Sequence, residues 1–81
     1  MDRAVVWQAL VDAVREETEN PSLTLRPDMA ANDVPGWDSL AHARIVMNLE
    51  ARTGAEIEIS DTYKAANLAA LCDVALAALP K

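Results

Sequence analysis

The sequence predicts an all-α protein: a small four-helix bundle of three main helices and one short helix, in a single domain spanning residues 1–81. Two observations predict this fold class. The composition combines 52% hydrophobic residues with only two glycines, which is typical of a compact helical domain and not of a disordered chain or a β-sandwich. Apolar residues also recur at helical spacing in three segments, whereas one short segment with strand-like alternation has no partner strand.

The first helix is expected to begin after Asp2, which can cap it, because Val6, Leu10 and Val14 recur four residues apart. It ends before Asn20-Pro21, since proline lacks an amide hydrogen and disfavours helical geometry in the residue before it. Residues 21–37 contain three prolines and are expected to form a long loop between the first two helices. Apolar side chains should hold this loop on the helices as an ordered strap; they are Leu23, Leu25, Met29, Val34 and Trp37.

The second helix is expected to begin at Asp38-Ser39 and to run to about Arg52, with Gly54 as its C-terminal cap. It carries two apolar stripes on roughly opposite faces. One consists of Ile45, Val46, Leu49 and the methyl of Thr53, and the other of Leu40, Ala43, Met47 and Ala51. A helix in so small a domain cannot bury both faces, so the second stripe either packs under the long loop or is a docking surface.

The last third of the chain predicts a connector and two further helices. Ile57-Glu58-Ile59 is interpreted as an extended connector with both isoleucines turned inward, because a lone strand would leave its backbone groups unpaired. Ser60 or Asp61 can cap a short helix that runs through Lys64. Asn67 can cap the last helix, which buries Leu68, Leu71, Cys72, Ala75 and Leu79 and ends at Pro80.

The charge balance restricts the partners of the protein. Thirteen acidic residues against seven basic ones give a formal net charge of −6, so nucleic acid and anionic membrane surfaces would repel the chain, and its partners should carry basic patches. The one cysteine cannot form an internal disulfide, and no Cys/His cluster has metal-ligand spacing. No stretch resembles a signal peptide or a membrane span. We therefore expect a cytoplasmic monomer without a metal site.

One serine stands out by its context. The triplet Asp38-Ser39-Leu40 opens the second helix, a long loop precedes it, and the run Val46-Met47-Asn48-Leu49-Glu50 follows. With these features the whole chain resembles an acyl carrier protein. The resemblance implies that a phosphopantetheinyl transferase attaches 4′-phosphopantetheine from coenzyme A to Ser39, and that Asp38 helps the transferase to bind. Such a protein is not an enzyme; it carries acyl groups as thioesters and presents them to acyltransferases, ligases or ketosynthase-type enzymes.

The same resemblance assigns further residues. It places partner docking at Leu40, Arg44, Met47 and Glu50, and it places an acyl-chain pocket at Ile57, Ile59 and Ala65. The carriers of fatty acid synthesis have carboxylates along the exposed side of this helix, where the present chain has Ala41 and Arg44. A basic partner surface would repel Arg44. This difference favours polyketide, antibiotic or other specialised biosynthesis over fatty acid biosynthesis.

Four alternative functions remain. A hydrolase could use Asp38, Ser39 and His42, but Asp38 adjoins Ser39 and would have to orient His42 from the wrong side, and no second segment offers oxyanion donors. His42 is therefore expected to be a packed or loop-bonded side chain, and Trp37 an anchor of the strap. A peptidyl or aminoacyl carrier would share the fold and the arm, as would a carrier for fatty acid synthesis. A helical adaptor would bind partners without any arm.

Overall fold

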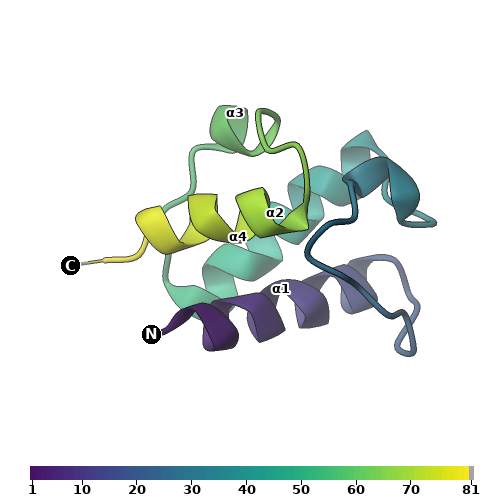
Figure 1. Cartoon of the computed structure of the whole chain (residues 1–81), viewed down its shortest axis with the longest axis horizontal. Helices are drawn as coiled ribbons and strands as arrows, with labels where there is room; N and C mark the ends of the chain where they lie inside the picture. Colours follow the sequence, from purple (N-terminus) through teal and green to yellow (C-terminus); the bar gives the residue numbers. More distant parts are fainter. Residues whose placement is uncertain (81) are drawn as a thin grey trace.

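The structure, a computed structural model that describes residues 1–80, contains four α-helices and one turn of 3-10 helix (Figure 1). In chain order they are α1 (Arg3–Glu17), η1 (Ala31–Asp33), α2 (Ser39–Thr53), α3 (Ile59–Thr62) and α4 (Leu68–Ala77). The prediction of an all-α bundle with three main helices and one short helix is confirmed. Within residues 1–80, none of the helices has the length and the apolar character needed to cross a membrane.

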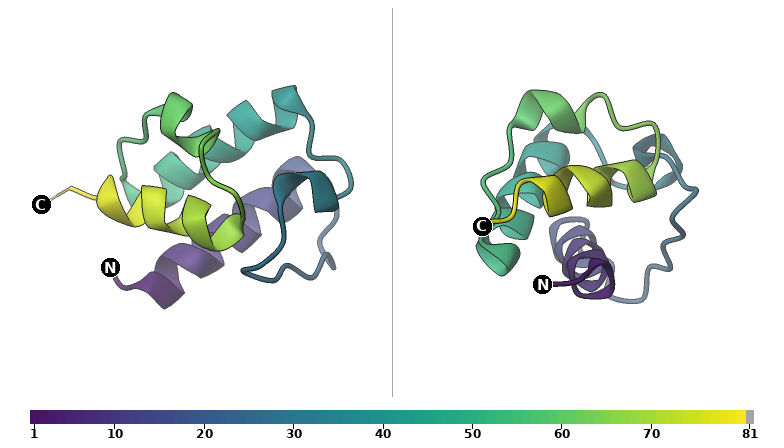
Figure 2. Two further views of the ribbon diagram at one scale, coloured as in Figure 1. Left: turned by 45° about the horizontal axis from the view of Figure 1, so that its top comes forward. Right: turned by 60° about the vertical axis from the view of Figure 1, so that its left-hand side comes forward.

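Helices α1, α2 and α4 enclose one hydrophobic core, and α3 lies beside α2 and α4 (Figures 1 and 2). The largest fully buried side chains come from all three long helices: Val6, Leu10 and Val14 from α1, Ile45 and Leu49 from α2, and Leu68 and Cys72 from α4. Burial of each large aliphatic side chain contributes about 1.5–3 kcal/mol. On α2, the residues Ile45, Val46 and Leu49 are all buried, which confirms the predicted inward stripe.

The helix ends match the capping residues of the sequence. The Asp2 carboxylate accepts a hydrogen bond from the Val5 amide, at 3.0 Å from Oδ1. The Asn67 side chain accepts one from the Ala70 amide at 2.8 Å. Gly54 ends α2 with a φ of 75°, in the left-handed region that glycine enters without steric cost. These bonds satisfy backbone groups that the helix itself leaves unpaired.

The long loop forms an ordered strap, as predicted, and the dark blue part of it runs around one end of the bundle (Figure 2). All five predicted anchors lie in the core or pack against it. The strap also supplies acceptors to α4, because the carbonyls of Met29 and Pro27 bind the amides of Leu68 and Ala69 at 2.8 and 2.9 Å. The 3-10 turn within the strap was not predicted; the Asp33 carboxylate stabilises it by accepting the Ala30 amide at 3.0 Å.

The short helix differs from its prediction. It begins at Ile59 and ends at Thr62, with Glu58 at the N-cap position and no side-chain cap, whereas the sequence suggested a cap at Ser60 or Asp61 and an end at Lys64. Helical geometry from Ile59 onward removes the two-residue alternation, so Ile57 and Ile59 do not share a face. The expectation that both turn inward is wrong: Ile57 is half-buried against the core and Ile59 is 37% exposed. Thr62 is the residue of α3 that is buried.

Candidate functional site

A tight turn delivers the chain to Ser39. In Val34-Pro35-Gly36-Trp37, proline stands second and glycine third with a φ of 85°, and the Trp37 amide donates to the Val34 carbonyl at 3.2 Å. Proline at the second position and a positive φ at the third define a type II turn. Asp38 continues in extended conformation, and Ser39 is the first residue of α2. The turn therefore sets where Trp37 and Ser39 lie relative to the rest of the bundle.

The cap of α2 is Asp38, which leaves the Ser39 side chain free of that role. The Asp38 carboxylate accepts the Ala41 amide at 2.8 Å, and the Asp38 carbonyl accepts the His42 amide at 2.8 Å. Ser39 itself is exposed. A negatively charged group on its oxygen would meet the positive end of the helix dipole and the unpaired amides of the first turn.

An open pocket of about 480 Å³ adjoins Ser39. Its walls come from the strap, from the start of α2 and from the segment around α3: Ala30, Ala31, Asn32, Trp37, Asp38, Ser39, His42, Thr62, Tyr63, Ala65 and Ala66. Of the three residues expected to enclose an acyl chain, Ala65 lines this pocket, whereas Ile57 packs against the core and Ile59 faces solvent. The structure thus does not bring these three side chains together in one cavity.

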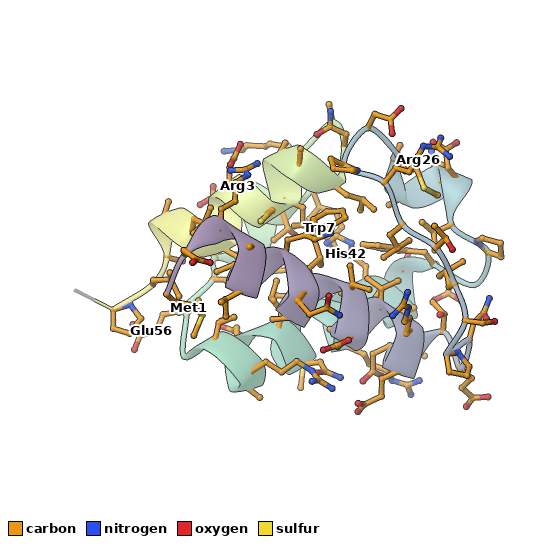
Figure 3. The ribbon with its side chains drawn as sticks, turned by 60° about the horizontal axis from the view of Figure 1, so that its bottom comes forward. Met1, Arg3, Trp7, Arg26, His42 and Glu56 are labelled. Atoms are coloured by element: carbon orange, nitrogen blue, oxygen red, sulfur yellow. The ribbon has the colours of Figure 1, made fainter. Side chains whose placement is uncertain are left out.

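His42 lies inside the bundle (Figure 3) and is bonded at both ring nitrogens. Its Nδ1 accepts the indole N–H of Trp37 at 3.0 Å, and its Nε2 lies 2.7 Å from the Thr62 hydroxyl. Burial lowers the pKa of His42 below its ordinary value. The expectation of a packed, loop-bonded histidine is confirmed. The triad of the hydrolase alternative is not formed in this structure, because the ring nitrogens bind Trp37 and Thr62 and the Asp38 carboxylate binds the Ala41 amide.

The aromatic wall of the pocket includes a residue that sequence reasoning missed. Tyr63, which follows α3 directly, stacks on the His42 ring with centroids 4.5 Å apart and an interplanar angle of 22°. Thr62 was missed as well, although it is the hydrogen-bond partner of His42. Both residues belong to a short helix whose position relative to α2 no sequence periodicity predicts. The sequence signal that could have identified Tyr63 was its rarity, because it is the one tyrosine in a chain with 4% aromatic residues.

The second apolar stripe of α2 faces solvent. Leu40 is 62% exposed, Met47 is 66% exposed and Arg44 is also exposed, and their spacing places all three on one side of the helix. We refer to Leu40, Arg44 and Met47 as the outer face of α2. Ala41 was expected on the exposed side but is buried, since it lies four residues before Ile45 and extends the inward stripe.

Glu50, the fourth residue of the expected docking set, has a structural contact. It lies beside the outer face, and its carboxylate accepts the amide of Ile57 at 2.9 Å. The bond ties the connector after α2 to the last turn of that helix. The structure therefore places Leu40, Arg44 and Met47 together and engages Glu50 with the backbone.

Comparison with known proteins assigns the fold. No protein-family model matches the chain, and no curated protein matches it. The chain is similar to the solution NMR structure of a holo acyl carrier protein from Geobacter metallireducens, with a TM-score of 0.77 and 26% sequence identity. The similarity covers 90% of this chain and 84% of that one. The bundle thus has the fold of an acyl carrier protein, and the resemblance inferred from the sequence is confirmed.

Proposed function

We propose that this protein is an acyl carrier that receives 4′-phosphopantetheine on Ser39 and presents acyl groups to partner enzymes. The observation that carries the proposal is the exposed Ser39 at the first position of α2, beside an open pocket, in an acyl-carrier fold. A carrier is favoured over a hydrolase that uses Ser39 as nucleophile, since the one histidine of the chain has both ring nitrogens engaged by Trp37 and Thr62.

The residues around Ser39 fit such a group. Asp38 satisfies the Ala41 amide, so the Ser39 oxygen can be modified without loss of the cap. In the transfer, Ser39 Oγ would form a bond to phosphorus, the adenosine bisphosphate part of coenzyme A would leave, and the hydroxyl proton would pass to the transferase. The arm supplies a terminal thiol that holds acyl groups as thioesters. Asp38, which is exposed next to Ser39, is proposed to help the transferase to bind.

The outer face of α2 is proposed as the surface that partner enzymes recognise, with Glu50 at its margin. Exposed apolar patches rimmed by polar residues mark interaction sites on soluble proteins, and a few residues near the centre of an interface contribute most of the binding energy. Leu40 and Met47 are exposed large hydrophobic residues on this face. Acyltransferases, ligases or ketosynthase-type enzymes are the proposed partners. Ala65, which lines the pocket beside Ser39, is the proposed contact for a bound acyl chain.

The charge on the outer face supports a specialised pathway. Arg44 replaces the carboxylates expected of a fatty acid carrier, and among residues 1–80 it forms no ion pair, unlike Arg3, Arg26 and Arg52. A partner with a carboxylate opposite Arg44 would gain from the contact, whereas a uniformly basic partner would not. We therefore favour polyketide or related specialised biosynthesis. Carriage of aminoacyl groups and fatty acid synthesis are the alternative functions.

The attachment site is tested by intact mass. The protein is incubated with coenzyme A, magnesium and a broad-specificity phosphopantetheinyl transferase, and a known carrier serves as the positive control. We expect a gain of one phosphopantetheine that is absent in Ser39→Ala and retained in Ser22→Ala and Ser60→Ala, which alter two other exposed serines. If the known carrier is modified and this protein is not, the carrier function is wrong.

The cargo is tested on the modified protein. Holo protein is offered to adenylating ligases and acyltransferases that activate acyl or aminoacyl substrates, and thioesters are detected by mass. We expect an acyl thioester. Formation of an aminoacyl thioester alone would assign the protein to the aminoacyl alternative.

A further inference from the structure

A chain of three hydrogen bonds links the strap, α2 and α3 through His42. The Trp37 indole N–H donates to His42 Nδ1 at 3.0 Å, His42 Nε2 lies 2.7 Å from Thr62 Oγ1, and the Thr62 hydroxyl donates to the Ile59 carbonyl at 2.6 Å. The His42 side chain is 7% exposed. Because Trp37, His42 and Thr62 all line the pocket next to Ser39, this chain of bonds holds two of its walls.

The donors and acceptors define one protonation state of His42. An indole N–H can only donate, so Nδ1 must accept and carries no proton. The Thr62 hydroxyl donates its proton to the Ile59 carbonyl. The Thr62 oxygen must therefore accept the hydrogen bond from His42, so the ring proton is on Nε2. The neutral ring therefore satisfies every partner. A protonated ring would place an N–H at Nδ1 directly against the N–H of Trp37.

The His42 ring nitrogens are bonded to Trp37 and Thr62, and within residues 1–80 the ring forms no hydrogen bond or ion pair with a charged side chain. The titratable or charged side chains on the elements around the ring include Asp33, Asp38, Glu58, Asp61, Tyr63 and Lys64. The carboxylates of Asp33 and Asp38 bind backbone amides, and Asp61 pairs with Lys64. Tyr63 stacks its ring on the imidazole. Burial lowers the pKa of His42, in agreement with this geometry.

We propose that His42 is a pH-sensitive positioning residue: the neutral ring fixes Trp37 and Thr62 as walls of the Ser39 pocket, and protonation breaks the bond to Trp37 and releases α3 from α2. An imidazolium gains hydration by turning toward the open pocket, which also removes it from Thr62. A helix of four residues does not persist without tertiary contacts. This inference concerns the pocket wall, so its test does not depend on whether Ser39 is modified.

The direction of the pH effect follows from the geometry. An unfolded histidine has a pKa of about 6.5, and the folded protein binds the proton less readily. Above that value His42 is neutral in both states and the bonds to Trp37 and Thr62 are intact. As the pH falls below it, the unfolded state and the state with these bonds broken take up the proton first, so the stability of the fold and of the pocket walls decreases until the folded-state pKa is passed.

The test is an NMR titration of the full-length protein, in which one histidine gives one unambiguous ring signal. Between about pH 8 and about pH 5, we expect the His42 midpoint to lie below the ordinary range. The Trp37 indole N–H and the amides of residues 59–62 should shift with the same midpoint, and exchange of these amides should speed up below it. The proposal would be overturned if the Trp37 indole signal did not change as His42 titrates. It would also be overturned if the titration midpoint of His42 were at or above the ordinary range.

Two variants separate a positioning role from simple packing. Trp37→Phe removes the opposing N–H and identifies its signal, and we expect the pKa of His42 to rise, because the bond from the indole N–H holds Nδ1 without a proton. An unchanged or lowered pKa would contradict the proposal. His42→Gln offers an oxygen to Trp37 and an N–H to Thr62 without titrating, so the pH response of the Trp37 indole and of α3 should disappear. Persistence of that response in His42→Gln would also overturn it, and if this variant does not fold, Trp37→Phe still decides.

Discussion

Truncation of Leu40 and of Leu49 should separate the outer face of α2 from its buried face. Full burial of a leucine or methionine side chain contributes about 1.5–3 kcal/mol. Leu40 is 62% exposed, so the covered two-fifths of its surface gives about 0.6–1.2 kcal/mol, and Leu40→Ala should lower the free energy of unfolding by no more than about 1.2 kcal/mol. Leu49 is fully buried, and Leu49→Ala should cost roughly 2–5 kcal/mol because it also leaves a cavity.

The assay is urea denaturation at neutral pH, with the free energy of unfolding extrapolated linearly to water. Met47→Glu, at a site that is 66% exposed, should resemble Leu40→Ala in stability. Ile45→Val, expected to cost about 0.5–1.5 kcal/mol, provides a milder buried control if Leu49→Ala is unfolded. Both outer-face variants should slow thioester transfer by partner enzymes while the buried variant that folds leaves it unchanged. A loss above about 2 kcal/mol in Leu40→Ala would show that the outer face is part of the core.

Substitutions at Asp38 and Gly36 test the approach to Ser39, and thiol labelling of Cys72 tests the interior of α4. Asp38→Ala should lower the free energy of unfolding by about 1 kcal/mol, because the cap is lost. Asp38→Asn keeps the cap, so slower modification of this variant by the transferase at unchanged stability would show that the transferase recognises the charge of Asp38. Gly36→Ala should cost about 1–2 kcal/mol in urea denaturation, because the φ of 85° is strained for alanine; an equal or higher stability would contradict the turn. Cys72 is buried and its thiol pKa is raised by burial, so a thiol reagent should label it slowly until urea unfolds the protein; rapid labelling of the folded state would refute this placement.

The long helices were predictable because each depends on local signals. The caps at Asp2, Asp38 and Asn67, the glycine at the end of α2 and the recurrence of apolar residues are all contained within a few turns of sequence. The ordered strap followed from its apolar anchors. Helix α3 was less accurate, because four residues are too few to show a period, and Ile57 and Ile59 alternate in sequence without sharing a face in the structure.

The position of Ser39 at the start of the second helix was predictable, whereas the pocket beside it was less so. Ser39 was identified from its neighbours in sequence and from a family resemblance. The bonds from Trp37 and Thr62 to His42 depend on a type II turn and on the docking of α3, which join residues 20 positions apart. Such contacts result from tertiary packing, and nothing in the local sequence of Thr62 indicates that its hydroxyl would be buried.

The two faces of α2 allow one helix to contribute to the core and to the proposed partner surface. A step of four residues from Ala41 to Ile45 and again to Leu49 runs along the core, and the corresponding step from Leu40 to Arg44 runs along the solvent side. His42 lies on the buried side of the helix, next to the stripe of Ala41, Ile45 and Leu49, and contacts α3. A change at Leu40 or Met47 should therefore alter the proposed partner surface without altering the pocket wall, whereas a change at His42 should alter the wall and leave the outer face intact. Partner binding and the position of the pocket wall should accordingly respond to different substitutions on the same helix.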